Sequence, residues 1–461
     1  MNIPTDALDR LIMPRVYGKV RRIVGLVVEG YCPHSSVGSL CEISPLEPGP
    51  PIPAEIVGYN NDQALLMPLG ELRGLGPGSL IRVIRETASI QVGEGLLGRV
   101  IDGMEQVLDE GPPLHLEATT PLYSLPPSPM QRQKITEPLD LGIRAINALL
   151  TCGTGQRMGI MAGSGVGKSV LLGMMAKYAK ADINVIALIG ERGREVREFI
   201  ERDLGEEGLK RSIIVVVTSD QSPLLRMRGA FVATAIAEYF SNQGKNVLLM
   251  MDSVTRFAMA MREIGLAVGE PPTTKGYTPS VFATLPKLLE RAGNFEGKGS
   301  ITGLYTVLVD GDDLTEPVAD SVRSILDGHI VLSRDIAAKN HYPAIDVMMS
   351  TSRVMRDIVS PRHMELAGKA RSVMAVYRES EDLINIGAYA AGSNKKIDYA
   401  ISRIDAINNF LCQGFNESAS LEDTIRDLGV LVSDRKGRDR RRPGRRNVER
   451  RKNPQIEETD A

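Results

Sequence analysis

The sequence predicts an α/β core with a largely parallel sheet, set between an N-terminal β-barrel and a C-terminal helical domain. Apolar β runs alternate with helical patterns over residues 136–360, which is typical of a parallel sheet covered on both faces. Short β-rich runs separated by Gly, Pro and Asn turns fill residues 15–93. Residues 361–433 show helical periodicity without strand signals. These three observations define the fold class.

The N-terminal part divides into three segments. Residues 1–14 form a lead in which ALDRLI has helical spacing, either a small interaction segment or a frayed end. Residues 15–93 carry regular short strands such as SLIRVI and ASIQVG, which favour a small antiparallel barrel or sandwich. Residues 94–135 are rich in Gly and Pro and form a connecting region.

Six apolar runs are the expected strands of the nucleotide-binding domain at 136–360. They are 157–162, 184–190, 213–219, 246–252, 301–310 and 329–333. The helical domain at 361–433 contains three expected helices. They are 365–386, 395–411 and 420–432.

The last segment, 434–461, is a basic tail that we expect to be disordered. Residues 435–461 hold eleven Lys/Arg and five Asp/Glu, whereas the whole chain has a net charge of −2. The tail is either a solvated extension or a segment attracted to anionic lipid or to nucleic acid.

Composition narrows the functional class. No apolar run is long enough to span a bilayer, and the N-terminus lacks the apolar region of a secretory signal. Four widely spaced cysteines and five scattered histidines do not have the spacing of a metal site. The few cysteines are most simply explained by a protein of the reducing cytoplasm. The chain has no Trp and 4% aromatic residues, which argues against an aromatic platform for nucleic acid.

The sequence RMGIMAGSGVGKS at 157–169 has the features of a phosphate-binding loop. An apolar strand stops at a glycine-rich turn, and Lys168 and Ser169 then open an apolar helix. Backbone N–H groups of such a loop point at phosphate oxygens, the lysine reaches the β- and γ-phosphates, and the serine supplies an oxygen to Mg²⁺. The strict pattern has Gly where this chain has Ala162. The expected nucleotide-binding residues are Gly163, Ser164, Gly165, Val166, Gly167, Lys168, Ser169 and Val170.

Two acidic residues follow buried strands of the same domain. Asp252 ends an apolar run and is a candidate for the second Mg²⁺ contact, although an Asp at this place also caps helices. Glu191 follows another run and is a candidate for the carboxylate that activates the attacking water. Glu195, one helical turn further on, fits a helix-start acid or an ion pair better.

The segment HYPAIDVMMSTSRVMRD at 341–357 offers Tyr342 and Arg353. We expect a short strand followed by a polar Ser-Thr-Ser turn, after which Arg353 stands in a loop. On local grounds such an arginine is solvated or in a surface ion pair. The rate gain that a trans-acting cation brings to phosphoryl transfer is the reason to consider it further.

Together with GERGREV, MDSVTRFAMAMREIG and DGDDLTEPVADSVRSILDGHIVLSR, these motifs resemble the export ATPases of type III protein secretion. This family is related to the catalytic subunits of F- and V-type rotary ATPases. The resemblance covers about residues 15–433, and LLMPLGELRGLGPG looks closest to the flagellar export ATPase. It implies a P-loop NTPase core of the RecA/F1 type that hydrolyses ATP with Mg²⁺.

The resemblance also implies roles for individual residues. Lys168 and Ser169 hold phosphate and Mg²⁺, Asp252 is the acid at the metal, and Glu191 activates water. Arg192 helps to arrange the γ-phosphate, and Arg353 is an arginine finger offered to a neighbouring subunit. Tyr342 stacks on the adenine, and Phe415 is a second adenine contact, with Phe410 as a weaker candidate.

The family further implies a homohexamer in the cytoplasm, associated peripherally with the cytoplasmic face of the inner membrane. Its expected partners are regulator and stalk proteins of the export apparatus and substrate–chaperone complexes, with no specific nucleic acid. The function that follows is ATP-driven protein export, most closely of the flagellar type. An injectisome ATPase, a non-hydrolysing rotary-ATPase-like subunit and a hexameric nucleic-acid motor are the alternatives, and the presence of Glu191 argues against the non-hydrolysing subunit.

Overall fold

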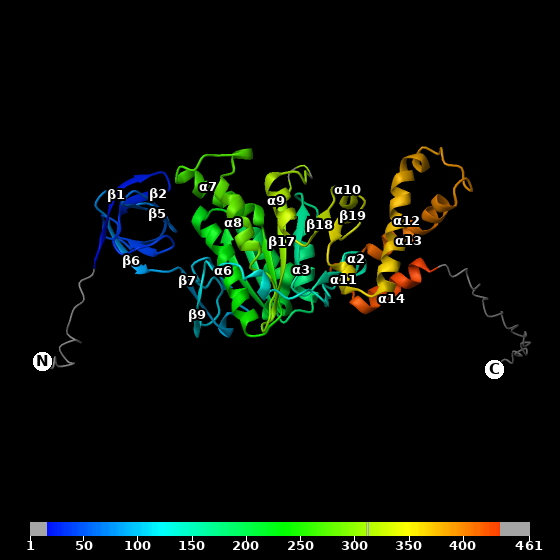
Figure 1. Cartoon of the computed structure of the whole chain (residues 1–461), viewed down its shortest axis with the longest axis horizontal. Helices are drawn as coiled ribbons and strands as arrows, with labels where there is room; N and C mark the ends of the chain where they lie inside the picture. Colours follow the sequence, from blue (N-terminus) through cyan, green and yellow to red (C-terminus); the bar gives the residue numbers. More distant parts are fainter. Residues whose placement is uncertain (1–15, 310, 312, 434–461) are drawn as a thin grey trace, which may run out of the picture.

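The computed structural model describes residues 16–309, 311 and 313–433. The described chain is elongated, with the barrel at one end, the α/β core in the middle and the C-terminal helices at the other end (Figure 1). The expected lead at 1–14 and the basic tail at 434–461 lie outside the described residues.

The N-terminal domain is a closed antiparallel barrel with the strand order β1-β2-β5-β4-β3-β6. Its strands are β1 (Gly18–Val24), β2 (Val27–Tyr31), β3 (Leu40–Ile43), β4 (Ile52–Asn60), β5 (Gln63–Pro68) and β6 (Leu80–Arg85). Alternating side chains such as Val28, Ile43 and Leu66 point inward and fill the interior, so the barrel has its own core.

The barrel ends earlier than the expected boundary at residue 93. The ASIQVG run forms β7 (Ser89–Val92), which pairs with β9 (Ala118–Pro121) in a separate two-stranded sheet. Ile90 and Val92 of β7 are buried in the cluster of the α/β core. The 94–135 segment also contributes β8 (Val100–Ile101), which pairs in parallel with β14 at the edge of the core sheet. Alternation of side chains alone does not say which neighbouring sheet a short strand joins.

The core sheet has nine strands, eight of them in the order β19-β18-β12-β17-β15-β13-β14-β8. Most pairs are parallel, whereas β19 and the short β16 are antiparallel to their neighbours. The strands after β8 are β12 (Arg157–Ala162), β13 (Ile183–Glu191), β14 (Ser212–Thr218), β15 (Val247–Asp252), β16 (Gly293–Asn294), β17 (Ser300–Leu308), β18 (Gly328–Leu332) and β19 (Ile345–Ser352). The six expected apolar runs are therefore all confirmed as strands.

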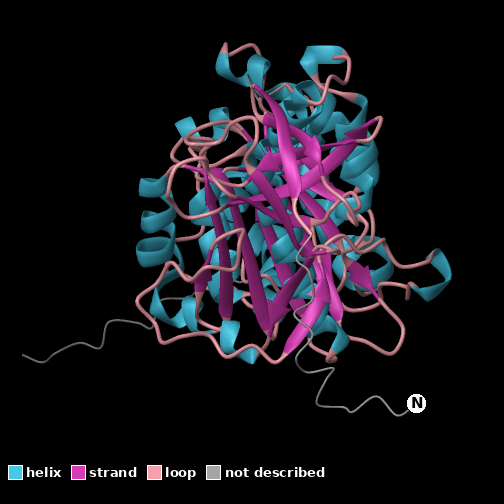
Figure 2. Cartoon of the chain, turned by 90° about the vertical axis from the view of Figure 1, so that its left-hand side faces the viewer, coloured by secondary structure: helices cyan, strands magenta, loops and turns pink. Residues whose placement is uncertain are grey.

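Helices cover both faces of this sheet (Figure 2). Alternate residues of β13 enter two different hydrophobic clusters, with Val185 and Ala187 in one and Ile186 and Leu188 in the other. The first cluster is closed by α6 (Pro223–Asn242), α7 (Val254–Ala267), α8 (Pro279–Leu289) and α9 (Pro317–Ile325). The second is closed by α2 (Arg144–Leu149), α3 (Lys168–Tyr178), the helical segment α4 (Gly193–Glu198) with its π-helical continuation, and the C-terminal helices.

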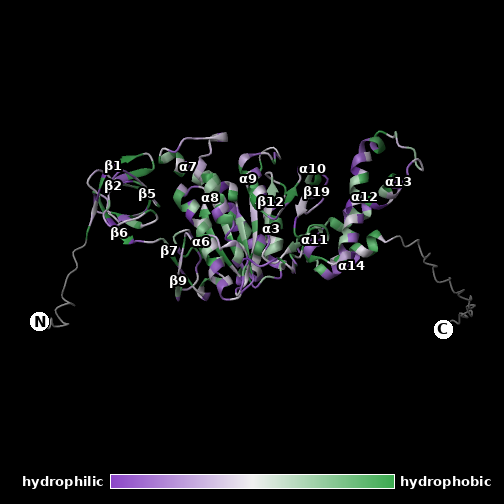
Figure 3. Cartoon of the chain, viewed as in Figure 1, coloured by the Kyte–Doolittle hydropathy of each residue, from purple (hydrophilic) through white to green (hydrophobic). Residues whose placement is uncertain are grey.

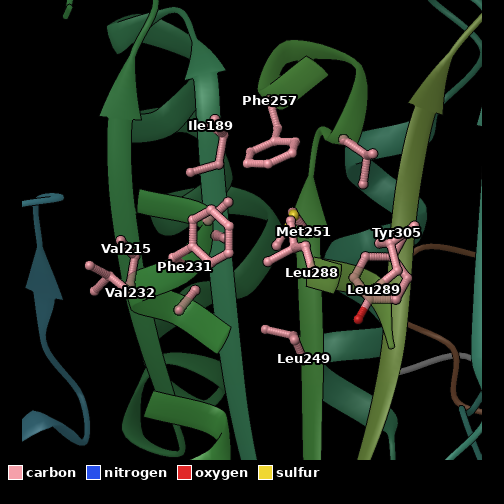
Figure 4. Packing of buried hydrophobic residues seen from close by; sticks show 14 of the residues in the cluster. Ile189, Val215, Phe231, Val232, Leu249, Met251, Phe257, Leu288, Leu289 and Tyr305 are labelled. Carbon is pink, nitrogen blue, oxygen red and sulfur yellow. The ribbon is translucent and has the colours of Figure 1, made fainter. Parts of the chain in front are cut away.

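Aromatic packing fixes the two long helices of the first face. The rings of Phe231 in α6 and Phe257 in α7 meet edge to face with their centroids 5.8 Å apart. Figure 4 shows the Phe257 ring beside Ile189 of β13 and above Met251 of β15, with the Phe231 ring lower, at about the level of Met251. Because β15 ends at the next residue, Asp252, this packing fixes the strand end on which an expected site residue stands.

The C-terminal domain is helical, as expected. It consists of α12 (Pro361–Asn385), α13 (Lys395–Leu411) and α14 (Leu421–Val432), preceded by the short α10 (Arg334–Ala338) and α11 (Met355–Ile358). In Figure 3 purple and green residues alternate along α12, in agreement with its one buried stripe of His363, Ala367 and Ala370. None of the described helices combines the length and apolar character needed to cross a bilayer.

The expected polar turn before Arg353 was wrong. Residues 350–352 continue β19, and Ser352 and Thr351 pair with Gly328 and His329 of β18. An edge strand tolerates polar side chains because one of its sides is solvated. Ser352 Oγ also donates a hydrogen bond of 2.8 Å to the Thr151 carbonyl.

Candidate active site

The phosphate-binding loop lies between β12 and α3, at the carboxyl edge of the sheet. Gly165 and Gly167 have φ values of +79° and +86°, a conformation that favours glycine. Ala162, where the strict pattern has Gly, is the last residue of β12 and pairs with Leu308 and Leu332. Since it is an ordinary strand residue, an alanine fits there without strain. Val166 is buried, whereas Ser164 and Ser169 are exposed toward the site.

Three expected site residues come together beside this loop. Lys168 Nζ lies 2.5 Å from Asp252 Oδ1 and 3.5 Å from Glu191 Oε1. All three side chains are largely buried, with 12%, 6% and 16% of their surface exposed. They converge because β12, β15 and β13 are near neighbours in one parallel sheet, whose carboxyl ends share an edge. Thr306 of β17 donates a 2.7 Å hydrogen bond to Asp252 Oδ1 and fixes that carboxylate.

The electrostatics of this group suit general-base chemistry. Burial raises the pKa of Glu191 to about 7, Asp252 adds to the rise, and Lys168 opposes it. Burial alone would lower the pKa of Lys168, but the carboxylates of Asp252 and Glu191 outweigh it and raise that pKa. A carboxylate with a pKa near 7 exchanges protons at neutral pH, as a general base requires.

Oxygen donors for a hard cation are present in the same place. Asp252 offers a carboxylate, and Ser169, one residue after Lys168, offers a hydroxyl in the first turn of α3. The described residues contain no group of three or more His, Cys, Asp or Glu side chains able to hold a metal by themselves. This set fits Mg²⁺, which keeps few protein ligands and takes phosphate oxygens as well.

Arg192 and Glu195 lie at the rim of the site. Arg192 precedes α4, and 74% of its side chain is exposed. Its ion pair with Glu195 spans 3.8 Å. Glu195 stands in the first turn of α4 and also pairs with Arg194, as expected for a helix-start acid. The structure therefore does not bring the Arg192 guanidinium to Lys168.

Arg256 is a site residue that the sequence reasoning missed. Its side chain covers Gly190, where an added Cβ would lie 2.9 Å from Arg256 Cβ and 3.3 Å from Cδ. The Arg256 side chain thus packs against the residue before Glu191, and its Nε is buried without a hydrogen-bond partner. A signal was available: Gly190 interrupts an apolar strand immediately before Glu191, and such a glycine marks the close approach of another chain segment.

Tyr342 also lies at the loop. A Cβ added to Gly167 would lie 3.5 Å from the Tyr342 ring, and the residue is 42% exposed. Gln413 donates a 2.8 Å backbone hydrogen bond to the Tyr342 carbonyl. Phe415, two residues further on, lies beneath the Lys177 ammonium of α3 at 4.5 Å. Phe410 is covered instead by Arg144, whose guanidinium lies 5.7 Å from the ring centroid.

Arg353 stands at the opposite edge of the sheet. Its backbone N–H donates to the Asp327 carbonyl at 3.0 Å, and the Asp327 N–H donates to the carbonyl of Arg157, the first residue of β12. The phosphate-binding loop begins after the last residue of that strand, Ala162. Five strand residues separate the two levels by roughly 17 Å, which exceeds the reach of an arginine side chain. Arg353 therefore cannot serve the Lys168 site of its own chain.

The fold and site define a P-loop nucleotide-binding enzyme, and similarity to known proteins gives its class. The model of the "ATP synthase alpha/beta family, nucleotide-binding domain" matches residues 142–352, and that of the "T3SS EscN ATPase C-terminal domain" matches residues 359–429. The flagellum-specific ATP synthase of Bacillus subtilis (strain 168) is 55% identical over 93% of this chain and 98% of its own length. The type 3 secretion system ATPase of Xanthomonas euvesicatoria is 49% identical over 93% of this chain and 96% of its own.

A solved structure agrees. The assembled ATPase EscN from the type III secretion system of enteropathogenic E. coli has a TM-score of 0.86 and 47% identity, over 90% of this chain and 100% of that one. EscN in complex with its central stalk EscO has a TM-score of 0.84 over the same coverage. The chain belongs to the family of flagellar and type III secretion ATPases, and it is an enzyme that hydrolyses ATP.

Proposed function

We propose that this protein hydrolyses Mg²⁺-ATP as a homohexameric ring, in which each chain supplies Arg353 to the nucleotide site of its neighbour. The observation that carries the proposal is the position of Arg353 at the sheet edge opposite to its own phosphate-binding loop. The assembled state named for EscN supports ring formation.

The mechanism assigns each residue a task. The loop N–H groups and Lys168 hold the phosphates, and Lys168 exchanges its contact with Asp252 for them when ATP enters. Ser169 and Asp252 would hold Mg²⁺, which neutralises charge on the β- and γ-phosphates. Glu191, ionised above pH 7, orients the attacking water and takes its proton. The neighbour's Arg353 stabilises charge on the transferring phosphoryl group, and Arg192, which follows Glu191 in the sequence, is proposed to help arrange the γ-phosphate.

Tyr342 and Phe415 are proposed to hold the adenine. Tyr342 is exposed beside Gly167, and Phe415 lies against the last turn of the helix that the loop opens. A flat aromatic face binds a base by stacking, which needs no particular hydrogen-bond pattern.

The energy of hydrolysis is proposed to drive protein export, with the flagellar system preferred to an injectisome. The 55% identity to the flagellar enzyme of B. subtilis supports the flagellar assignment, although relatives of both kinds match at about 50%. We further propose a stalk protein as a partner, as named for EscN, together with chaperone complexes and a position at the cytoplasmic face of the inner membrane.

The test mixes two inactive variants. In Lys168→Ala the phosphate site is lost but Arg353 is intact, and in Arg353→Ala the reverse holds. In random mixed rings up to about a quarter of the interfaces join an intact site to an intact Arg353. We expect the ATPase rate per wild-type chain to rise with protein concentration, and the mixture to recover activity that neither variant has. No recovery, with mixed rings demonstrated by pull-down of a tagged variant, would refute the trans role of Arg353.

A further inference from the structure

A second arginine accompanies Arg353 at its edge of the sheet. Arg353 Nη2 donates to the backbone carbonyl of Arg323, the seventh residue of α9, at 3.3 Å. The half-buried Arg323 guanidinium donates through Nη1 to the Leu314 carbonyl at 3.3 Å. Its Nε is buried and has no hydrogen-bond partner. The Arg353 guanidinium therefore contacts the backbone at Arg323, and each of the two guanidinium groups has donors left over.

No acidic group of the described residues neutralises this pair. Neither Arg323 nor Arg353 forms an ion pair within the described ranges 16–309, 311 and 313–433. The nearby Asp327 is occupied by Arg157, which donates to its two carboxylate oxygens at 3.0 Å each. His329 adds no negative charge: burial lowers its pKa, and Arg323 and Arg353 lower it further. Guanidinium groups that the described residues leave without a carboxylate partner are complemented by an added anion.

We propose that Arg323 is a second cation that acts in trans, binding together with Arg353 the terminal phosphate of the nucleotide held by a neighbouring copy. The proposal rests on the trans role of Arg353 proposed above. A terminal phosphate has three outward oxygens, so two guanidinium groups can each make charge-assisted hydrogen bonds to it. Arg323 is better held than a surface arginine, because its stem is sheltered in α9 and one donor is tied to Leu314.

The neighbouring Arg356 offers a matched control. It stands three residues after Arg353 in α11 but is exposed to solvent. Removing it takes one positive charge from the same part of the molecule without touching the Arg323–Arg353 contact. An effect of net surface charge would therefore appear equally in Arg356→Ala and Arg323→Ala.

The experiment measures ATPase kinetics of full-length Arg323→Ala, Arg323→Lys and Arg356→Ala, each alone and mixed with Lys168→Ala. We expect Arg323→Ala to lower kcat by about 10- to 100-fold, less than the roughly 10³- to 10⁵-fold of an arginine finger, with a smaller change in KM. Mixing with Lys168→Ala restores activity, since that variant brings an intact Arg323. Arg323→Lys retains part of the rate, and Arg356→Ala matches wild type.

A second measurement separates anion binding from folding or assembly. Inhibition by ADP with aluminium fluoride, a phosphoryl-transfer mimic, becomes at least about tenfold weaker in Arg323→Ala, while sedimentation shows rings as in wild type. A defect of Arg323→Ala that Lys168→Ala does not complement, or that comes with loss of rings, overturns the trans role of Arg323. If Arg323→Ala has wild-type kinetics while Arg353→Ala is inactive and is complemented by Lys168→Ala, only the Arg323 inference is overturned. Failure of Arg353→Ala itself to be complemented overturns the proposed function.

Discussion

Replacing Glu191 by Gln should stabilise the nucleotide-free protein at pH 8 while abolishing hydrolysis. Glu191 is buried beside Asp252, and its pKa rises from 4.5 to about 7. The folded state thus binds a proton between these two pH values that the unfolded state has released. The free energy of unfolding therefore falls as pH rises from about 4.5 to 7, and stays lowered above it. A neutral Gln does not carry this penalty.

The magnitude follows from the shift. At 1.36 kcal/mol per pKa unit, ionised Glu191 costs the folded state up to about 3 kcal/mol. The 3.5 Å contact with Lys168 is lost in the variant, and the glutamine amide must still find partners. We therefore expect a gain of about 1–2 kcal/mol at pH 8, which is a rise in Tm of about 2–4 °C for a domain of this size. At pH 5, where folded Glu191 is protonated, most of this difference should disappear.

Thermal unfolding of both proteins without nucleotide, at pH 5 and pH 8, measures this difference. Glu198→Gln is the control, because Glu198 stands in α4, the helical segment that follows Glu191, but is 44% exposed and pairs with Arg194. In the wild type, kcat/KM should also rise as pH passes about 7, since Glu191 must be ionised to act as the base. An equal Tm difference at both pH values, or a less stable Gln variant at pH 8, would refute the reasoning.

Two further predictions concern the adenine site and the joint between barrel and core. Tyr342→Ala should raise the KM for ATP about tenfold with a small effect on kcat. Tyr342→Phe should behave as wild type, because stacking needs the ring and not the hydroxyl. Steady-state kinetics of both variants test this, and equal effects of the two changes would contradict the adenine role. Arg228→Ala should lower the free energy of unfolding by about 3–5 kcal/mol, because it leaves buried Glu55 of the barrel unpaired. Denaturant unfolding measures the loss. Addition of Glu55→Gln should restore the part that is due to Glu55, but not the part that is due to the Arg228 contacts with Gly103 and Glu105, and no restoration at all would contradict the prediction.

Strands and helices of the core were predictable because local patterns determine them. Each apolar run of the core formed a strand, since a parallel strand buried on both faces must be apolar throughout. The loop was equally clear, because a glycine turn between strand and helix has few other uses. The convergence of Lys168, Glu191 and Asp252 also followed from the sequence, as the carboxyl ends of parallel strands share an edge.

Features that depend on which segments meet in space could not be predicted. β7 has the alternation of a barrel strand but packs on the core. Residues 350–352 have the composition of a turn but complete an edge strand. Arg256 packs against Gly190 because α7 passes close to it there, and the position of Arg256 in the sequence does not reveal that contact.

The arrangement of charge across the sheet explains why assembly would control activity. One edge of the sheet concentrates the carboxylates of Glu191 and Asp252 around a single lysine, and the opposite edge holds arginines 323 and 353, which form no ion pair with another described residue. Among the described residues the two charged groups do not neutralise each other, because the length of the strands, roughly 17 Å, keeps the two edges apart. Juxtaposing the two edges of different copies around a nucleotide would supply the anion that the arginines lack and the cations that the phosphates need. A monomer would then bind ATP without hydrolysing it efficiently, and the rate would report the number of closed interfaces.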